Sequence, residues 1–502
     1  MSSIAVVGGG ISGMAAALAL SRSGHHITLF EQDEIAQAAD PHEAFEAHRR
    51  GAPQVRHSHA FLARLRNLLR TDYPDVLDAL YAAGASDLRF ADGIPSTITD
   101  FVPEDGDEDL GMLACRRTTF EWVVRNIVVA EGKVVVRSGT HVAGLVGAEV
   151  ERRGDPPRVT GVRLDGEHLG QVGPVGEIEH FDWTVVATGR RSALPAWLEE
   201  IGAGQVPEVV DDSGIVYFSR FYRLKPGESV PPRTGPIGGD LGYLKYGVFV
   251  GDNGTFSLTL ACATDDTHMR TLLDDDDRFD DVGRRLVFTR DYLDGRADPI
   301  TGVNKIAGLV SRWRDYVVDG VPLALNVLPI GDAHFATNPL YGRGCTTGFV
   351  NAHLLAGVLG EHERSGALAV ALAHDEVIRA ELKPWVMHTM HTDAEARRVA
   401  AAILAGSDPD ADQSDPRTFM RSVLRSGLRP AMRTDQVVLR AFFRNFNLLT
   451  QPNALAGDAD FGARVLAAYN ERDARPPEPY LGPDRSELVD AVPLASLRVA
   501  GE

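Results

Sequence analysis

The sequence predicts an α/β protein in which a parallel-sheet domain is joined to an antiparallel sheet and a mostly helical C-terminal region. Three observations predict this class: an apolar strand that leads into a glycine-rich turn near the N-terminus, alternating apolar and polar residues between 205 and 317, and Ala/Leu/Arg-rich segments with helical spacing after residue 366. The composition agrees, because 44% hydrophobic and 24% charged residues are ordinary for a globular chain of 502 residues.

The first thirty residues predict a strand–turn–helix–strand unit. Residues 4–7 are apolar and β-branched and predict a buried strand, residues 14–21 predict a helix, and residues 26–30 predict a second strand. The turn between the first strand and the helix satisfies G-x-G-x-x-G, with the sequence Gly8-Gly9-Gly10-Ile11-Ser12-Gly13. This context predicts dinucleotide binding.

Each glycine of the turn has a physical task in that interpretation. Gly8 permits the tight turn, Gly10 leaves room for a pyrophosphate, and Gly13 lets the helix approach the strand closely. Glu31 ends the second strand, where its carboxylate can accept hydrogen bonds from an adenosine ribose. The same carboxylate repels a 2′-phosphate, so the sequence predicts NAD or FAD rather than NADP as the bound dinucleotide.

A second stretch favours FAD over NAD. Residues 327–333 predict a buried strand that ends in Gly331-Asp332-Ala333, and a carboxylate at that place can bind ribityl hydroxyls. The loop with Gly342 and Gly344 then precedes a predicted helix over 346–359. Its backbone N–H groups and the helix N-terminus would lie where negative charge develops on a reduced flavin.

These motifs together resemble the single-component FAD-dependent monooxygenases, a family that includes para-hydroxybenzoate hydroxylase and squalene epoxidase. The nearest resemblance is to bacterial natural-product epoxidases and hydroxylases. It extends to Gly-Ala-Pro-Gln-Val-Arg-His-Ser-His at 51–59 and to Arg-Thr-Thr-Phe-Glu at 117–121, whose Arg lies against the cofactor in the family. A third family stretch matches residues 187–192, but the Asp that the family normally carries there is missing. This chain has Val186 and Thr188, which leaves the mode of NAD(P)H docking open.

The resemblance implies bound FAD, NAD(P)H as a transient co-substrate, and transfer of one oxygen atom from O2 to a small organic substrate. Epoxidation or hydroxylation in secondary metabolism is the expected activity. The residues expected to bind the cofactor are Gly8, Gly10, Ser12, Gly13, Glu31, Gln54, Arg117, Gly331, Asp332, Pro339, Gly342, Arg343, Gly344 and Cys345. Those expected to act in catalysis are Arg56, His57, Gly342 and Gly344, the first two because their loop follows the second strand at the carboxyl edge of the sheet.

The Rossmann-like FAD-binding domain is expected to be discontinuous. The predicted domains are 1–86, 111–204 and 318–365 for FAD, 87–110 and 205–317 for a substrate-binding sheet, and 366–502 for the helical region. Further strands are expected at 134–136, 142–146, 159–164, 184–187, 215–224, 243–250 and 255–263, with a turn at 252–254. Residues 475–479, with three prolines, predict an extended linker.

Charge and cysteine content exclude several classes of function. A formal net charge of −19 disfavours nucleic-acid binding and anchoring on an anionic membrane. The cysteines Cys115, Cys262 and Cys345 are far apart and odd in number, which fits a reducing cytoplasm and disfavours a disulfide framework. Cys345 is expected to pack rather than to form a covalent flavin link. No membrane span is predicted, and the oligomeric state, monomer or dimer, stays open.

Three patterns could mimic a metal site, and none is predicted to be one. His57 and His59 have a ligand spacing but no third ligand nearby, and His388 and His391 are expected to be an ordinary helical pair. The acidic run over 274–281 lacks the spacing of a calcium loop and predicts a solvated face.

Other functions of a flavoprotein stay open at this point. One is an FAD-dependent dehydrogenase, oxidase or reductase that transfers no oxygen, and another is a binding or carrier protein without catalysis. Flavin halogenases share the expected fold, although their W-x-W-x-I-P signature is absent from this sequence.

Overall fold

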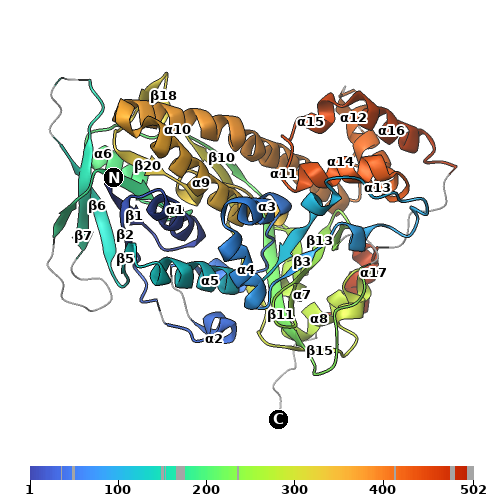
Figure 1. The fold of residues 1–502 in the computed structure, drawn as a ribbon. Helices are drawn as coiled ribbons and strands as arrows, with labels where there is room; N and C mark the ends of the chain where they lie inside the picture. The colour runs from blue at the N-terminus through green and yellow to red at the C-terminus, as the bar shows by residue number, and fades with distance from the viewer. Residues whose placement is uncertain are drawn as a thin grey trace, which may run out of the picture.

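The computed structural model shows a parallel sheet, several antiparallel sheets and a C-terminal group of helices (Figure 1). The description below covers the whole chain except residues 36, 48–50, 149–151, 153, 166–175, 234–236, 412–413, 416, 475–480 and 495–502. The linker predicted over 475–479 lies outside the described residues.

The parallel sheet has the strand order β20-β9-β1-β2-β5 and confirms the predicted Rossmann-like core. Its strands are β1 (Ser3–Val7), β2 (His26–Phe30), β5 (Val134–Arg137), β9 (Trp183–Val186) and β20 (Val327–Pro329). Chain order reverses at β1, which has β2 on one side and β9 on the other. Ligands of such sheets bind at the carboxyl ends of the strands beside this reversal.

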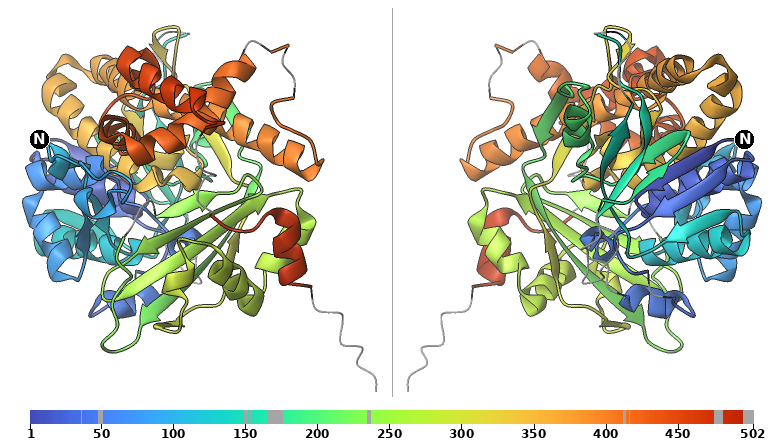
Figure 2. Two further views of the ribbon diagram at one scale, coloured as in Figure 1. Left: turned by 90° about the vertical axis from the view of Figure 1, so that its right-hand side faces the viewer. Right: turned by 90° about the vertical axis from the view of Figure 1, so that its left-hand side faces the viewer.

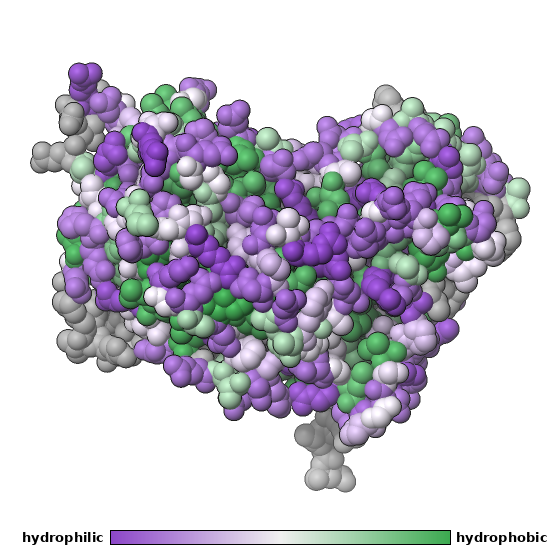
Figure 3. All heavy atoms as spheres, in the orientation of Figure 1, coloured by the Kyte–Doolittle hydropathy of each residue, from purple (hydrophilic) through white to green (hydrophobic). Residues whose placement is uncertain are grey.

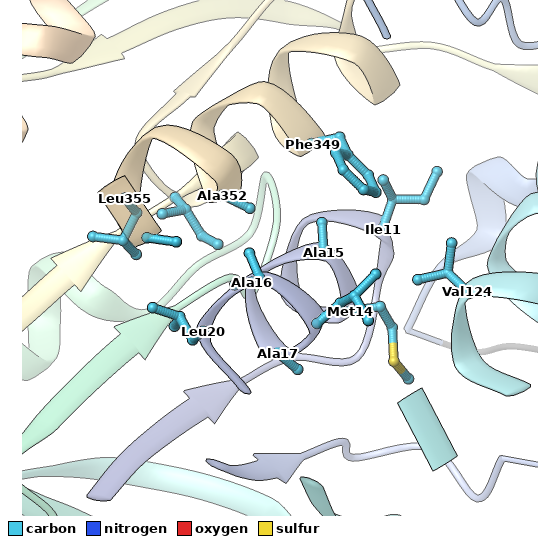
Figure 4. Close-up of a cluster of buried hydrophobic side chains, with 14 of the residues drawn as sticks. Ile11, Met14, Ala15, Ala16, Ala17, Leu20, Val124, Phe349, Ala352 and Leu355 are labelled. Atoms are coloured by element: carbon cyan, nitrogen blue, oxygen red, sulfur yellow. The ribbon is translucent and has the colours of Figure 1, made fainter. Parts of the chain in front are cut away.

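Helix α1 (Ile11–Arg22) is enclosed between α9 (Gly344–His362) and α5 (Arg117–Ala130). Figure 4 shows Ala15 and Ala16 of α1 facing α9, and Met14 directed toward α5. Small side chains on the α9 side let the two helix axes approach closely. The helix starts three residues before the predicted 14–21, so Ser12 and Gly13 belong to its first turn.

A larger antiparallel sheet has the order β12-β13-β14-β11-β15, with β16 also paired to β11. Strands β11 (Ile215–Leu224) and β14 (Thr255–Ala263) have the predicted bounds, and β13 (Leu244–Val250) starts one residue late. Between β13 and β14, Asn253 and Gly254 both adopt positive φ, of 51° and 66°. This conformation is the one that tight hairpin turns require, and Asn-Gly adopts it readily.

Residues 205–317 do not form one sheet. Strands β10 (Glu208–Asp212) and β17 (Val310–Arg314) pair with each other, and β17 pairs with β21 (Phe335–Ala336). This three-stranded sheet connects the segment before the large sheet with the segment after β20. The other strands are β3 (Ser86–Leu88), β4 (Met112–Ala114), β6 (His141–Gly147), β7 (Val159–Asp165), β8 (Ile178–His180), β12 (Gly238–Asp240), β15 (Ala297–Pro299), β16 (Asn304–Ile306), β18 (Val317–Val318) and β19 (Val321–Pro322).

Helices dominate the chain after residue 366, as predicted. Figure 2 shows those up to α16 above the large antiparallel sheet, whereas α17 lies beside the sheet and packs on it through Leu488. They are α10 (Ala367–Glu381), α11 (Lys383–Leu404), α12 (Arg417–Val423), a π-helical segment (Leu424–Leu428), α13 (Arg429–Thr434), α14 (Gln436–Phe446), α15 (Ala454–Gly457), α16 (Ala459–Asn470) and α17 (Arg485–Ala491). The remaining α-helices are α2 (Pro41–Glu46), α3 (Ala63–Asp72), α4 (Pro74–Ala82), α6 (Leu194–Glu200), α7 (Thr267–Leu273) and α8 (Asp276–Arg285).

The acidic run is more than a solvated face. Asp276 and Asp280 pair with Arg220 of β11 at 3.1 and 3.0 Å, and Asp280 accepts a hydrogen bond from the Tyr222 hydroxyl. Asp275 caps α8 by accepting from the Arg278 amide. These carboxylates attach α8 to the large sheet.

None of the helices in the described part of the chain has the length and apolarity needed to cross a membrane.

Candidate functional site

A cavity of about 2550 Å³ begins at the carboxyl edge of the parallel sheet. Its wall includes the turn after β1, side chains of β11 and β14, and side chains of the C-terminal helices. A pocket for one drug-sized ligand has roughly 300–1,000 Å³. The cavity therefore has room for a dinucleotide and a second organic molecule together.

The glycine turn lies at one end of this cavity. Gly8 has a φ of +107°, and a Cβ there would meet the Ala187 carbonyl oxygen at 2.6 Å. A Cβ on Gly13 would meet the Gly8 carbonyl oxygen at 1.8 Å. A Cβ on Gly10 would meet nothing within 4 Å and would project into open space. The turn thus has the shape of a pyrophosphate cradle, which Gly10 leaves clear.

Glu31 lies beside this turn, at the end of β2. Its carboxylate accepts hydrogen bonds from the Gly9 amide at 2.8 Å and the Asp33 amide at 2.9 Å, and the residue is 5% exposed. Glu31 also contributes to the cavity wall. The two amides orient a carboxylate toward the space where an adenosine ribose would lie.

Asp332 marks the other side of the glycine turn. Gly331 has a φ of +55°, and a Cβ on it would meet Ser12 Oγ at 2.3 Å, while a Cβ on Gly348 of α9 would meet the same atom at 2.4 Å. Two glycines therefore let Ser12 bring the turn against Asp332. Arg190 donates from Nε to Asp332 Oδ2 at 3.1 Å. This arginine belongs to the segment 187–192, which lacks the Asp that is typical of the family. The sequence did not indicate a role for Arg190.

We expect Asp332→Ala to weaken FAD binding about ten- to a hundredfold, because a hydrogen bond to a charged group contributes roughly 1.5–3 kcal/mol. The side chain of Asp332 is 34% exposed, so the fold should tolerate its loss. Fluorescence titration of the apoprotein with FAD measures the affinity, with Asp332→Asn as the matched variant that keeps an acceptor. Unchanged FAD affinity in Asp332→Ala would contradict the assignment.

The loop 54–59 contributes to the middle of the cavity with Gln54, His57, Ser58 and His59. His57 Nδ1 lies 3.2 Å from Ser219 Oγ, which lies 2.9 Å from Thr259 Oγ1. Burial lowers the pKa of His57 to about 4. His57 is therefore neutral near pH 7 and joins a chain of buried hydroxyl groups.

Arg56 is placed differently from its neighbours. It is not among the described residues of the cavity wall. Its guanidinium lies 4.7 Å from the ring centroid of Phe45 and donates to the Glu46 carbonyl oxygen at 3.2 Å. The expectation that Arg56 acts in catalysis is thus not supported by its position, because its cation lies over an aromatic ring of α2 and not in the cavity wall.

Arg117 begins α5 and lies in the cavity wall. It donates to Glu121 Oε1 at 2.8 Å, and its Nη1 lies 3.2 Å from His59 Nε2. Burial and the charge of Arg117 lower the pKa of His59 to about 3, so this histidine accepts the hydrogen bond in its neutral form. Burial also raises the pKa of the Cys345 thiol, to about 12.

The loop before α9 is held from outside the sheet domain. Asn338 Nδ2 donates to Asp393 Oδ1 at 2.8 Å, and the Tyr341 hydroxyl donates to the same oxygen at 3.1 Å. Asp393 is on α11 and is 1% exposed, and its burial raises the pKa of this carboxyl. Tyr217 of β11 donates to Asn338 Oδ1. Sequence reasoning missed both Asp393 and Tyr217, because nothing local to either residue indicates its partner.

Gly342 lets this loop approach Ala60, which follows the loop 54–59. Gly342 has a φ of +64°, and a Cβ on it would meet Ala60 Cβ at 2.6 Å. Gly344 begins the 19-residue helix α9, so the amides of its first turn lie at the cavity wall. The residues of the predicted cofactor set that line the cavity are Gly8, Gly10, Ser12, Glu31, Gln54, Arg117, Asp332, Pro339, Gly342, Arg343, Gly344 and Cys345. Gly13 and Gly331 lie behind the wall, where they allow close packing.

Arg343 is mostly buried between two rings. Its guanidinium lies 4.9 Å from the Tyr341 ring centroid and 4.7 Å from that of Trp385, and it donates to Thr389 Oγ1 at 2.6 Å. Burial lowers its pKa to about 10, so it keeps its charge at neutral pH. Arg343 therefore connects the loop to α11 in addition to any contact with a cofactor.

Both His388 and His391 line the cavity. The sequence predicts only an ordinary helical pair here and gives no sign that the two residues belong to a site. Burial, together with the charge of Arg343, lowers the pKa of His388 to about 4. The helix α11 thus contributes the neutral imidazole of His388 to the cavity. The position of α11 at the cavity depends on the packing of this helix against the loop before α9.

Because several histidines are buried in their neutral form, we expect the folded protein to lose stability in mild acid. Burial lowers the pKa of His59 to about 3 and that of His374 to about 4, and it lowers the pKa of His334 well below the ordinary value. The unfolded chain binds protons on these groups below about pH 6.5, whereas the folded protein does not. The free energy of unfolding should therefore fall from pH 7.5 to 5.5, by about 1.4 kcal/mol for each histidine.

Urea unfolding at the two pH values measures this fall. His374→Gln should reduce it by about 1.4 kcal/mol, because glutamine cannot bind the proton. His26, an exposed residue, serves as control, and His26→Gln should leave the fall unchanged. Equal falls in the wild type and in His374→Gln would contradict the prediction.

Comparisons with known proteins agree with this geometry. Residues 3–93 match the model of the FAD dependent oxidoreductase family (DAO). Protein Rv3254 of Mycobacterium tuberculosis (strain ATCC 25618 / H37Rv) is 29% identical over 459 residues, which are 88% of this chain and 89% of that protein.

Two solved structures show the same fold at low sequence identity. A triple mutant of the flavin-dependent brominase Bmp2 superposes with a TM-score of 0.56 at 15% identity, covering 95% of this chain and 100% of that one. PqsL, a probable FAD-dependent monooxygenase from Pseudomonas aeruginosa, has a TM-score of 0.53 at 17% identity, covering 80% and 96%. Residues 3–93 thus match an FAD-dependent oxidoreductase domain, and the chain has a fold that is also found in a flavin-dependent brominase and in a probable FAD-dependent monooxygenase.

Proposed function

We propose that this FAD-dependent oxidoreductase is a monooxygenase, which uses NAD(P)H and O2 to epoxidise or hydroxylate an organic substrate of secondary metabolism. The observation that carries the proposal is the continuity of the cavity. It contains a dinucleotide cradle at one end and extends, past the loops 54–59 and 338–344, to apolar walls that no cofactor needs. Bound FAD would supply electron transfer from NAD(P)H and the activation of O2.

The chain itself would bind the cofactor and the substrate, orient them and exclude water. The amides of the glycine turn and the carboxylates Glu31 and Asp332 would hold the two halves of FAD. The first turn of α9 would stabilise negative charge on the reduced flavin. The neutral His57 and the Cys345 thiol would add no charge beside it at neutral pH.

A second organic molecule would lie between the loop 338–344 and the large sheet. Tyr217, Ser219 and Thr259 of this sheet are buried and contribute to the same wall. A substrate bound against this wall would displace water from the reacting atoms and so disfavour the unproductive reduction of O2. NAD(P)H would dock transiently, because only one dinucleotide cradle is found along the sequence, and the reaction would take place in the cytoplasm.

His57 and Arg56 are a matched pair for testing the placement of the loop. We expect His57→Ala to slow NAD(P)H-driven flavin reduction roughly tenfold, the effect of losing one hydrogen bond that positions a group. Arg56→Ala should keep the wild-type rate, because its guanidinium contacts Phe45 and Glu46. Stopped-flow reduction with FAD content checked in each variant decides this. Equal rates in all three proteins would remove His57 from the flavin environment.

The proposed activity is tested with 18O2. The FAD-loaded protein is incubated with NADH or NADPH, bromide and a panel of olefins and phenols, and the products are examined by mass spectrometry. One 18O atom in a product supports the proposal. Oxidised products without 18O would make the protein a dehydrogenase or oxidase, and brominated products would make it a halogenase.

A further inference from the structure

We propose that the substrate is an elongated, largely apolar molecule with one anionic group, and that Arg233 binds this group. This inference rests on the proposed function and names the class of substrate for it. It is carried by two independent observations, an apolar extension of the cavity into the C-terminal helices and a mostly buried arginine in the cavity wall that has no carboxylate partner among the described residues.

The extension, here called the apolar chamber, is the part of the cavity bounded by α12–α16. Its wall includes Phe419, Leu424, Met432, Phe442, Phe446 and Phe461. Because FAD has to lie along the glycine turn and Asp332, these side chains are left for another ligand. Apolar side chains on several helices form a surface that binds hydrocarbon by the hydrophobic effect.

The chamber reaches the surface of the molecule. Phe419, Met420 and Leu424 line it and are also 56, 55 and 47% exposed. Figure 3 shows apolar residues gathered among polar ones over this group of helices. Large apolar side chains clustered at a cavity mouth mark a binding surface rather than ordinary exposure. A long apolar ligand would therefore enter and extend along this path.

Several other cations of the cavity wall already have carboxylate partners. Arg421 pairs with Asp415 at 2.8 Å, Arg425 pairs with Glu395 at 3.1 Å, and Lys245 pairs with Asp240. Such groups have little attraction left for a ligand, because their own carboxylates neutralise them.

Arg233 differs from these cations. Its Nη1 donates to the Arg89 carbonyl oxygen at 3.3 Å, and its buried Nε has no hydrogen-bond partner among the residues that the structure describes. Burial lowers the pKa of this guanidinium. The carboxylate of nearby Asp92 is engaged by two hydrogen bonds from Arg89, at 2.9 and 2.8 Å. A buried cation without a carboxylate partner is costly, and an anionic ligand would relieve that cost.

Arg233 lines the cavity beside Gly93. Gly93 also lines the cavity, and a Cβ on it would meet Arg233 Nη2 at 2.5 Å, so a side chain there would compete for the same space. Phe90, three residues before Gly93, packs on Phe443 of α14 with ring centroids 5.2 Å apart. Arg233 therefore lies beside a wall of the apolar chamber, where one ligand can contact both.

Calorimetric titration of the FAD-loaded protein tests this with four probes: dodecanoate, 1-dodecanol, dodecylamine and butanoate. We expect dodecanoate to bind at least tenfold more tightly than each of the other three. Arg233→Ala should weaken dodecanoate about ten- to a hundredfold and leave dodecanol unchanged, the size expected for a charge-assisted hydrogen bond. Arg233→Lys should retain part of the preference, and Arg290→Ala, which removes an exposed arginine outside the cavity wall, should retain all of it.

Two matched variants test the apolar chamber. Leu424→Glu should weaken both dodecanoate and dodecanol, whereas Val437→Glu should weaken neither, since Val437 is 40% exposed and does not line the cavity. Equal binding of dodecanoate and dodecanol, no binding of any probe, or an undiminished preference in Arg233→Ala would overturn the inference. Binding is measured without turnover, so failure of 18O transfer with these affinities intact would refute only the proposed function.

Discussion

Replacing Gly10 with valine is expected to abolish FAD binding, by at least about a hundredfold in affinity, while the protein remains folded. A Cβ at this position meets no protein atom within 4 Å, and the φ of −79° and ψ of −173° are extended backbone that valine adopts readily. The new side chain would instead occupy the space of the pyrophosphate. Titration of the apoprotein with FAD measures the loss, and circular dichroism with thermal unfolding measures the fold.

Gly13→Val is the contrasting variant. A Cβ at Gly13 would overlap the Gly8 carbonyl oxygen at 1.8 Å, so the strand and helix would have to separate and the domain should not fold stably. A Gly10→Val protein that binds FAD normally would show that the cofactor does not lie in this cradle. A Gly10→Val protein that unfolds would show that the glycine is structural.

Replacing Asp252 with alanine is expected to destabilise the protein by about 3–5 kcal/mol. Asp252 accepts hydrogen bonds from Arg116, from the amide at 2.8 Å and from Nη2 at 2.6 Å, and the two side chains are 0 and 2% exposed. Asp252 lies in the β13–β14 turn, and Arg116 immediately precedes α5. The pair therefore joins the large sheet to the FAD-binding part, and removal of one partner leaves a buried charge.

Urea unfolding of the single and double variants measures this coupling. The double variant Asp252→Leu with Arg116→Met should be less destabilised than Asp252→Ala, because it buries no unpaired charge. Asp294→Ala, which removes the exposed partner of Arg296, should leave the stability close to that of the wild type. A loss below about 1 kcal/mol in Asp252→Ala would show that water reaches the pair.

The sequence by itself determined the elements whose signals are local. Strands β2, β11 and β14 have the predicted bounds, and the predicted Asn-Gly turn joins β13 to β14, because short apolar runs and turn residues are properties of neighbouring residues. The glycine turn followed from the strand before it and the helix after it. Recognition of an FAD-binding fold depended on those local patterns together with the residues around Asp332.

Only the tertiary structure decided which side chains face the cavity. Arg56 and His57 are adjacent in the sequence, yet only His57 lines the cavity, because Phe45 offers Arg56 an alternative contact. Asp393 supports the loop at Asn338 from 55 residues away. The physical reason is that periodicity sets which face of an element is apolar, whereas partners across the chain depend on how helices and sheets pack. Packing, rather than any local pattern, placed α11 and Arg233 in the wall of the cavity.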